Sequence, residues 1–447
     1  MINAIRHARF ELLTHSKHPF ANLLCRETEW YADDEEKVLG TVFLDLTDMD
    51  WAFVILGRDE QGVFRWIDGD SSFESPDKAR PSLQGAMNAA LLRGEGVFPQ
   101  VAELKARKNS IAVPVAARER LHPYFRALIE NEEYSPAREV IVELGYAYQD
   151  LDGNFIEQLQ TTGFDARLWE LYLYAFLHEQ RFMIDDSQPV PDYLCSKFGK
   201  EIAIEATTVG PTQTRKDPGP PNNPIQLKHW LRHFMPIKYG SALYSKLRKK
   251  YWDTPRVAGK PLVFAIHDFH GGGSMTWSST ALPMYLYGYE HDWQRDKMGR
   301  LVVIPNKTDY HEWEGKRIPS GFFSLPGSEH VSAVLFSNSA TISKFNRMGK
   351  LADAGSDRVR MIRLGTSYNH DPDSAAPASF QVDIDPDEYD ETWSEGVSIY
   401  HNPQAVTPID HELFDGIAQH VLCDDGQIVS NIPPFHPLNS VTHIWLE

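Results

Sequence analysis

The sequence has few cysteines and no long apolar run. Its 447 residues include only three cysteines, Cys25, Cys195 and Cys423, which lie far apart in the chain. An odd number of widely spaced cysteines argues against both a disulfide framework and a thiolate zinc site. There is no uncharged apolar stretch of about 18 residues that could span a bilayer, and the first residues lack the apolar core of a secretory signal. We therefore expect a soluble cytoplasmic protein with no membrane partner.

Phosphate-binding glycine motifs and internal repeats are also missing. The run Gly271-Gly272-Gly273 has neither the spacing of a P-loop nor that of a dinucleotide-binding loop, which leaves these nucleotide-binding classes without support. A chain of 447 residues is longer than a single hydrophobic core normally supports, so two or three domains are expected.

Positive charge is scarce overall but concentrated in one tract. The formal net charge of −18 repels nucleic acid as a global field. Between Ala206 and Trp252, however, nine lysines and arginines accompany a single acid, a local net charge of +8. Such a tract could hold a polyanion, or it could be a solvated helix face without a specific partner. The candidate nucleic-acid-binding residues are Lys228, Arg232, Lys238, Arg248, Lys249 and Lys250.

Apolar periodicity and turn residues predict three regions. Residues 1–120 are expected to form an amino-terminal α+β domain with an antiparallel meander, strands 40–46, 51–56 and 62–67, followed by helical segments 77–93 and 102–108. Residues 121–345 contain the core with its preceding helices. Its order is helix 165–180, strands 181–184, 192–195 and 201–207, helices 225–234 and 241–252, and strand 261–267, with 301–304 as an edge strand and 331–336 as a further buried strand. Residues 346–447 are expected to form a β-rich extension.

Three acids occupy three consecutive elements of this core. Glu170 lies on the first helix, Asp192 opens the second strand and Glu205 lies in the third. A carboxylate within an apolar element is costly to desolvate, so a metal ion, a cation or a strong hydrogen-bond donor usually lies beside it. Asp192 precedes Glu205 by 13 residues, which suits two antiparallel strands joined by a turn. Because hard divalent ions take oxygen ligands, these acids predict a site for Mg²⁺ or Mn²⁺.

These residues resemble the PD-(D/E)xK nuclease superfamily, which has the restriction-endonuclease-like fold. The resemblance depends on Glu170, on Pro191-Asp192 and on Ile202-Ala203-Ile204-Glu205, together with the order helix, three strands, helix, strand. It covers residues 163–269, about a quarter of the chain, and implies an α/β fold. It also implies a metal-dependent nuclease that hydrolyses DNA phosphodiester bonds, with Glu170, Asp192 and Glu205 as catalytic metal ligands.

The chain departs from the superfamily pattern at one position. The pattern places a lysine two residues after the second acid, where this sequence has Thr207. That lysine orients or deprotonates the attacking water and offsets the charge of the transition state. In the superfamily the lysine can migrate to the following helix. Lys246, beside the apolar Leu243, is our candidate for that catalytic role, with Lys250 as the alternative.

Other interpretations stay open at this point. The chain could be a catalytically inactive nuclease-like module that binds nucleic acid or a protein partner, and a homodimer is compatible with the sequence. Asp192 could instead cap a turn while Glu205 pairs with a lysine such as Lys228. The run His267-Asp268-Phe269-His270 places two imidazoles three residues apart, but no third zinc ligand is identifiable, so turn-region histidines are the simpler interpretation.

Overall fold

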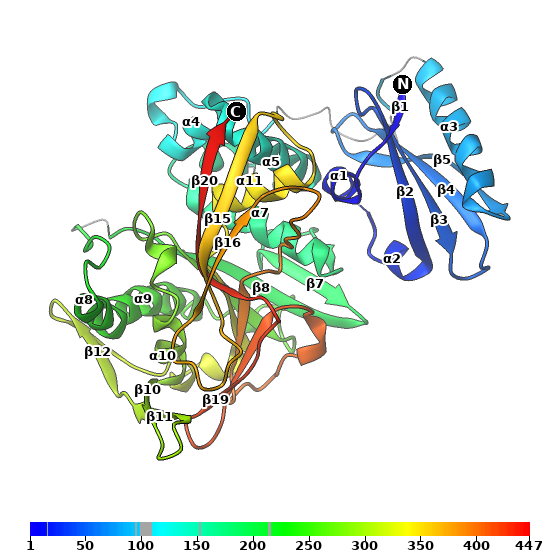
Figure 1. Cartoon of the computed structure of the whole chain (residues 1–447). Helices are drawn as coiled ribbons and strands as arrows, with labels where there is room; N and C mark the ends of the chain where they lie inside the picture. The colour runs from blue at the N-terminus through cyan, green and yellow to red at the C-terminus, as the bar shows by residue number, and fades with distance from the viewer. Residues whose placement is uncertain (16, 94–95, 99–109, 152, 213–215) are drawn as a thin grey trace.

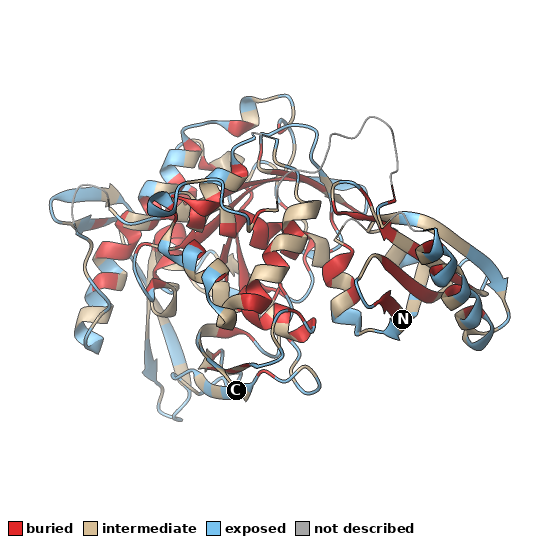
Figure 2. Cartoon of the chain, turned by 90° about the horizontal axis from the view of Figure 1, so that it is seen from above, coloured by how far each residue is buried: buried red, intermediate tan, exposed pale blue. Residues whose placement is uncertain are grey.

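The computed structural model describes residues 1–447 except 16, 94–95, 99–109, 152 and 213–215, so the helical segment expected at 102–108 lies outside the described residues. The protein is a mixed α/β structure, built on an eight-stranded sheet with smaller sheets around it. Buried residues concentrate in the strands of the large sheet and in the helices packed on it (Figure 2). Among the described residues, no helix combines the length and apolarity needed to cross a membrane.

The amino-terminal unit is a five-stranded antiparallel sheet with helix α3 on one face and helix α1 against the other (Figure 1). The sheet also contains β1 and β2 at one edge, two strands that the sequence patterns did not predict. Helix α3 packs closely on the sheet because Gly40 has no side chain: a Cβ there would lie 2.7 Å from atoms of Leu83 and Met87. The elements are β1 (Ile2–Ala4), α1 (His7–Leu13), α2 (Ala21–Leu24), β2 (Cys25–Asp33), β3 (Val38–Asp45), β4 (Trp51–Arg58), β5 (Phe64–Phe73) and α3 (Pro76–Leu92).

Helix α7 (Phe164–Glu179) is the central helix of the main body. Its apolar side chains pack on one face of the large sheet, against Ile202 and Val263 among others. Three preceding helices and a later one complete this layer: α4 (Pro123–Glu130), α5 (Ser135–Ala147), α6 (Phe155–Gln160) and α11 (Ile342–Leu351). Because neighbours surround it, α7 is apolar on most of its circumference rather than along one narrow stripe.

The large sheet has the strand order β19-β18-β17-β14-β9-β8-β7-β6. Strands β7 and β8 form an antiparallel hairpin, whereas β8, β9 and β14 run parallel to one another. Strands β9 and β14 are buried along their whole length, as their continuous apolar sequences predict. The strands are β6 (Met183–Asp185), β7 (Tyr193–Lys197), β8 (Lys200–Val209), β9 (Leu262–Asp268), β14 (Ala333–Ser337), β17 (Val397–His401), β18 (Ala418–Leu422) and β19 (Ile428–Asn431).

A long helical segment covers the opposite face of the large sheet. It begins as α8 (Pro224–His229), continues through a π-helical turn (Trp230–Phe234) and ends as α9 (Met235–Leu247), where the sequence predicted two separate helices. Trp230 and Tyr239 pack into the core between this helix and the sheet. Beyond it lie α10 (Ala281–Tyr287) and two short ribbons, β10 (Tyr289–Arg295) with β11 (Leu301–Lys307), and β12 (Tyr310–Trp313) with β13 (Lys316–Pro319).

The carboxy-terminal residues differ from the separate β-rich extension expected from position 346. Strands β17, β18 and β19 extend the large sheet, and only β15 (Val359–Ser367), β16 (Ala378–Asp383) and β20 (Pro437–Leu446) form a sheet of their own. A buried charge cluster anchors the connecting segment. The fully buried Glu391 carboxylate accepts hydrogen bonds from Lys344 Nζ at 2.7 Å and from Arg347 at 2.8 and 2.9 Å, which ties this segment to α11.

Candidate active site

The β7–β8 hairpin brings two of the predicted acids together. Its register pairs Tyr193 with Ile204, so one step further along the ladder Asp192 lies opposite Glu205. Asp192 immediately precedes β7, and its Oδ2 accepts a hydrogen bond from the backbone N–H of Ala206 at 2.7 Å. Asp192 does hold a backbone N–H, as the turn-cap interpretation supposed, but that N–H belongs to the neighbouring strand and sets the carboxylate beside Glu205.

The third acid reaches the same region from the helix on the other face of the sheet. Glu170 in α7 is 8 % exposed, and its Oε2 accepts a hydrogen bond from Arg167 Nη1 at 2.6 Å. Tyr148 Oη lies 3.5 Å from the same oxygen. The hydroxyl of Tyr193 donates to the main-chain oxygen of Glu170 at 2.7 Å, which fixes α7 against the start of β7.

Lys246 contacts Glu205, although 41 residues separate them in sequence. Its Nζ donates to Glu205 Oε1 at 2.5 Å, and the hydroxyl of Tyr251 donates to the same oxygen at 2.5 Å. The Lys246 side chain is 19 % exposed and that of Glu205 is 6 % exposed. Lys246 can reach the acid because Glu205 lies on the sheet face that α9 covers. An amine from the next helix therefore lies beside Glu205, two residues before Thr207 in β8.

The clustered carboxylates shift one another's protonation. Burial, reinforced by the negative charges of Glu205 and Glu170, raises the pKa of Asp192 to about 8. Burial also raises the pKa of Glu170, against the opposing effect of Arg167. A bound cation would relieve this repulsion, so the donor set suits a hard divalent ion.

The three acids do not form a closed coordination shell by themselves. Among the described residues, one group of three side chains has all its ligand atoms within 4.8 Å of one another. It consists of His7, Glu11 and Glu27, not of the three predicted acids. Lys17 Nζ lies 2.9 Å from Glu11 and 3.0 Å from Glu27, so an amine already neutralises that cluster. At the predicted site, Arg167 and Lys246 hold Glu170 and Glu205 in the same way.

The six predicted nucleic-acid-binding residues fall into two groups. Lys228 and Arg232 pair with Glu290 on β10, and Lys238 Nζ lies 2.8 Å from Asp217. These three cations are therefore largely neutralised by acids of the protein itself. The remaining three follow α9, are exposed, and form no ion pair with an acid among the described residues: Arg248, Lys249 and Lys250.

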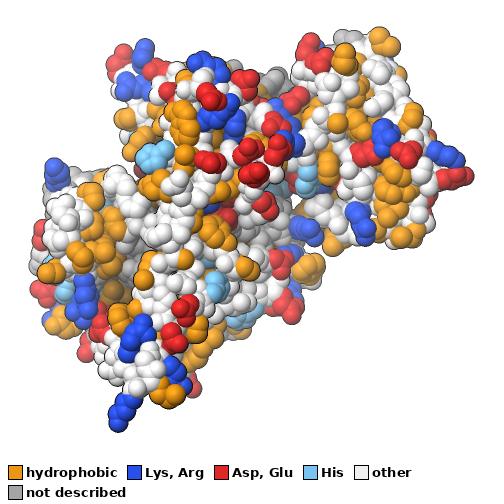
Figure 3. All heavy atoms as spheres, viewed as in Figure 1, with side chains coloured by type: hydrophobic (Ala, Val, Ile, Leu, Met, Phe, Trp, Pro, Cys, Tyr) orange, Lys and Arg blue, Asp and Glu red, His pale blue; other side chains and the backbone are white. Residues whose placement is uncertain are grey.

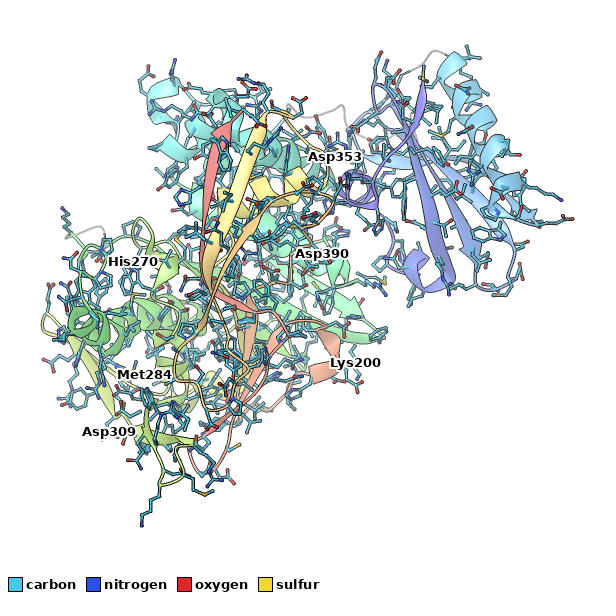
Figure 4. The ribbon with its side chains drawn as sticks, viewed as in Figure 1. Lys200, His270, Met284, Asp309, Asp353 and Asp390 are labelled. Carbon is cyan, nitrogen blue, oxygen red and sulfur yellow. The ribbon has the colours of Figure 1, made fainter. Side chains whose placement is uncertain are left out.

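A wide cleft of about 1070 Å³ lies between the amino-terminal unit and the main body. Acidic side chains gather on this side of the molecule (Figure 3), where Figure 4 labels Asp353 and Asp390. Asp387, Glu388 and Asp390 are among the residues that line the cleft. Its charge opposes the approach of a polyanion from that direction.

The two histidines of the 267–270 run lie in different environments. His267 is fully buried, contacts Trp169 of α7 and accepts a hydrogen bond from the Ala340 N–H at 3.1 Å, and burial lowers its pKa to about 3. His270 instead contacts Phe234 and Trp277 on the other side of the sheet. The two imidazoles therefore lie on opposite sides of the sheet. His267 belongs to β9, so only His270 lies beyond the strand, as the turn-region interpretation expected.

Sequence reasoning missed three side chains that support the acids. Arg167 stands three residues before Glu170, and that i, i+3 spacing on one helix face was a usable signal. Tyr148 and Tyr251 carried no local signal, because their contacts join elements far apart in sequence. Comparison with protein-family models, with curated proteins and with solved structures finds no significant match for the chain.

Proposed function

We propose that the chain is a metal-dependent nuclease that hydrolyses phosphodiester bonds of DNA. The observation that carries this proposal is the 2.5 Å contact between Lys246 Nζ and Glu205 Oε1. A lysine amine beside the second acid is what the PD-(D/E)xK resemblance requires and what Thr207 cannot supply. The order α7, β6, β7, β8, α9, β9, with β8 and β9 parallel, supports the restriction-endonuclease-like core that the resemblance implies.

Asp192, Glu205 and Glu170 would hold the metal ion. Their carboxylates are suitable ligands, and the raised pKa of Asp192 reflects a repulsion that a bound cation would offset. When bound, Mg²⁺ or Mn²⁺ lowers the pKa of a coordinated water and stabilises negative charge on the phosphate. Mg²⁺ usually keeps several waters, so it does not need three carboxylates in one tight group. The repulsion among the acids would then be offset by the ion.

The residues of the chain supply orientation and charge. The Ala206 N–H fixes one Asp192 oxygen, which leaves the other oxygen of that carboxylate for the ion. Tyr251 holds Glu205 from the side of α9. Lys246, as an ammonium, can orient the attacking water and offset charge that develops on the phosphate oxygens. The exposed Arg248, Lys249 and Lys250 extend that positive charge along the end of α9, where they can contact neighbouring phosphates.

Cleavage of supercoiled plasmid in the presence of Mg²⁺ or Mn²⁺ tests the proposal. Asp192→Ala should abolish nicking and linearisation, because it removes the acid between the other two. Asp186→Ala is the matched control, since Asp186 is exposed and lies six residues earlier in the same region. Activity that survives in Asp192→Ala would come from a contaminant or another site, and would reject the assignment.

A second candidate function is a nuclease-like module that binds DNA without cutting it. The contacts of Arg167 with Glu170 and of Lys246 with Glu205 favour it, because protein cations already neutralise two of the acids. In that case the wild type and Asp192→Ala would both be inert with every nucleic-acid substrate, yet retain DNA at low salt.

A further inference from the structure

A small pocket opens where strands β8 and β9 end. It has a volume of about 270 Å³, close to the lower end of the range for ligand pockets, about 300 Å³. The segments 211–212 and 216–220 form one wall, and the loop from His270 to Trp277 forms the other. His270 is labelled in Figure 4, on the side of the molecule that carries α8 and α9.

An aspartate fixes the histidine that lines this pocket. Asp268 ends β9 and is fully buried, and its Oδ1 lies 2.7 Å from His270 Nδ1 and accepts the His270 N–H at 3.0 Å. Ser278 Oγ donates to the other carboxylate oxygen at 2.5 Å. The carboxylate therefore accepts a hydrogen bond from Nδ1–H, and in this tautomer of the neutral imidazole the lone pair lies on Nε2. Among the described residues, Nε2 has no hydrogen-bond partner, although His270 is only 4 % exposed.

The other lining residues favour a flat ligand. Lys216 and Asp217 are the charged residues of the described lining, and Asp217 is paired with Lys238 at 2.8 Å. Trp277 presents a part-exposed ring, and three prolines add apolar surface: Pro211, Pro218 and Pro220. The lone pair of an acceptor nitrogen does not suit a phosphate, whose oxygens need hydrogen-bond donors.

The glycine loop offers donors for the opposite edge of such a ligand. The N–H groups of Gly271 and Gly272 have no acceptor among the described residues. A Cβ at either position would meet nothing within 4 Å, so the backbone is open to the pocket. A planar ring with both N–H donors and a carbonyl or ring-nitrogen acceptor would satisfy His270 and this loop together. Nucleobases have that combination.

We propose that this pocket takes an unstacked nucleobase of the substrate strand, with His270 Nε2 accepting an N–H of the base and Trp277 contacting its face. The proposal builds on the proposed nuclease function and specifies how the substrate is recognised. Glu205 and Val209 are four residues apart on β8, which at 3.3 Å per residue is about 13 Å. A single strand bound at the acids can therefore reach the pocket.

Binding of the four deoxynucleoside 5′-monophosphates, measured by calorimetry with EDTA present, tests this inference. At least one nucleotide should bind saturably, and His270→Ala should weaken it at least tenfold. His270→Gln, which keeps an acceptor oxygen, should weaken it less. His443→Ala is the matched control, because His443 is exposed on β20 and does not line the pocket. Trp277→Leu gives a second test should His270→Ala fail to fold.

Three results would overturn the proposal. They are no nucleotide binding at millimolar concentration, equal binding by His270→Ala and wild type, and equal binding of inorganic phosphate or ribose 5-phosphate. The assay contains no divalent ion and measures no cleavage. A protein that binds nucleotides but never cuts DNA would therefore reject the nuclease function alone, and an active nuclease without nucleotide binding would reject the pocket alone.

Discussion

Replacing Lys246 by methionine gives the sharpest test of the candidate site. The Glu205 carboxylate is 6 % exposed and has two donors, Lys246 Nζ and the Tyr251 hydroxyl, each at 2.5 Å. Methionine keeps much of the aliphatic volume but removes the charge, so the buried carboxylate retains only the neutral hydroxyl. Removing one partner of a buried ion pair costs about 3–5 kcal/mol.

The expected loss is at the lower end of that range. Lys246 is 19 % exposed, so water partly screens the pair, and Tyr251 remains in place. We expect Lys246→Met to lower the free energy of unfolding by about 3 kcal/mol. With a denaturant dependence of about 3 kcal/mol per molar urea, the midpoint of the main-body transition should fall by about 1 M. Cleavage should fall by a factor of about 100 or more, because the amine also serves the reaction.

Two further variants separate this explanation from a general effect of substitution. Lys250→Met removes an exposed lysine without an acidic partner among the described residues, and should change stability by about 0.5 kcal/mol or less. Glu205→Gln in the Lys246→Met background removes the unpaired charge and should recover part of the stability but no activity. If Lys246→Met unfolds at the same urea concentration as the wild type, or cleaves at the same rate, the assignment of Lys246 is wrong.

Three more outcomes can be measured. Because the pKa of Asp192 is raised to about 8, only about 1 % of this side chain is ionised at pH 6. Apparent Mn²⁺ affinity should thus rise about tenfold per pH unit from pH 6 to 8 and then level off; a flat profile by calorimetry would contradict this. Burial lowers the pKa of His15 to about 3 and of His178 to about 4, because the folded protein favours the neutral imidazoles. The stability that the fold gains from these neutral histidines is complete above about pH 6.5 and is lost as pH falls towards the two lowered pKa values. Urea midpoints should decline over that window, less steeply in His15→Phe, and an equal slope in the variant would refute the assignment. Changing Arg248–Lys250 to glutamine should reduce the slope of log DNA affinity against log salt by up to about 2.7 in fluorescence anisotropy, and an unchanged slope would show that these residues do not contact phosphates.

The sequence alone identified the local elements around the site. Apolar periodicity marked helix α7, and the short apolar runs marked β7, β8, β9 and β14. The spacing of 13 residues between Asp192 and Glu205 predicted a hairpin that sets the acids side by side, and β7 and β8 have that geometry. These features could be predicted because each depends on neighbours within one or two elements. The apolar Leu243 beside Lys246 likewise indicated which face of α9 meets the sheet.

Contacts between distant segments were decided only by the tertiary structure. Local patterns do not show that β17, β18 and β19 join the large sheet, because a strand's sequence records how it is buried but not which strand it pairs with. The same limit applies to charge. Lys228 and Arg232 counted towards a basic tract in the sequence, yet β10 brings Glu290 to them from about 60 residues away.

The site itself shows the same division. The sequence supplied three acids, the absence of a lysine at position 207 and Lys246 as the candidate replacement. The fold places Lys246 against Glu205 and adds Tyr251 and Arg167 as partners of the acids. The covalent structure of a side chain fixes which group it carries, but the charge and the effect of that group depend on what else is buried within a few ångströms. The sequence therefore determined which groups are present, and the packing of α7 and α9 on opposite faces of one sheet determined which of them meet.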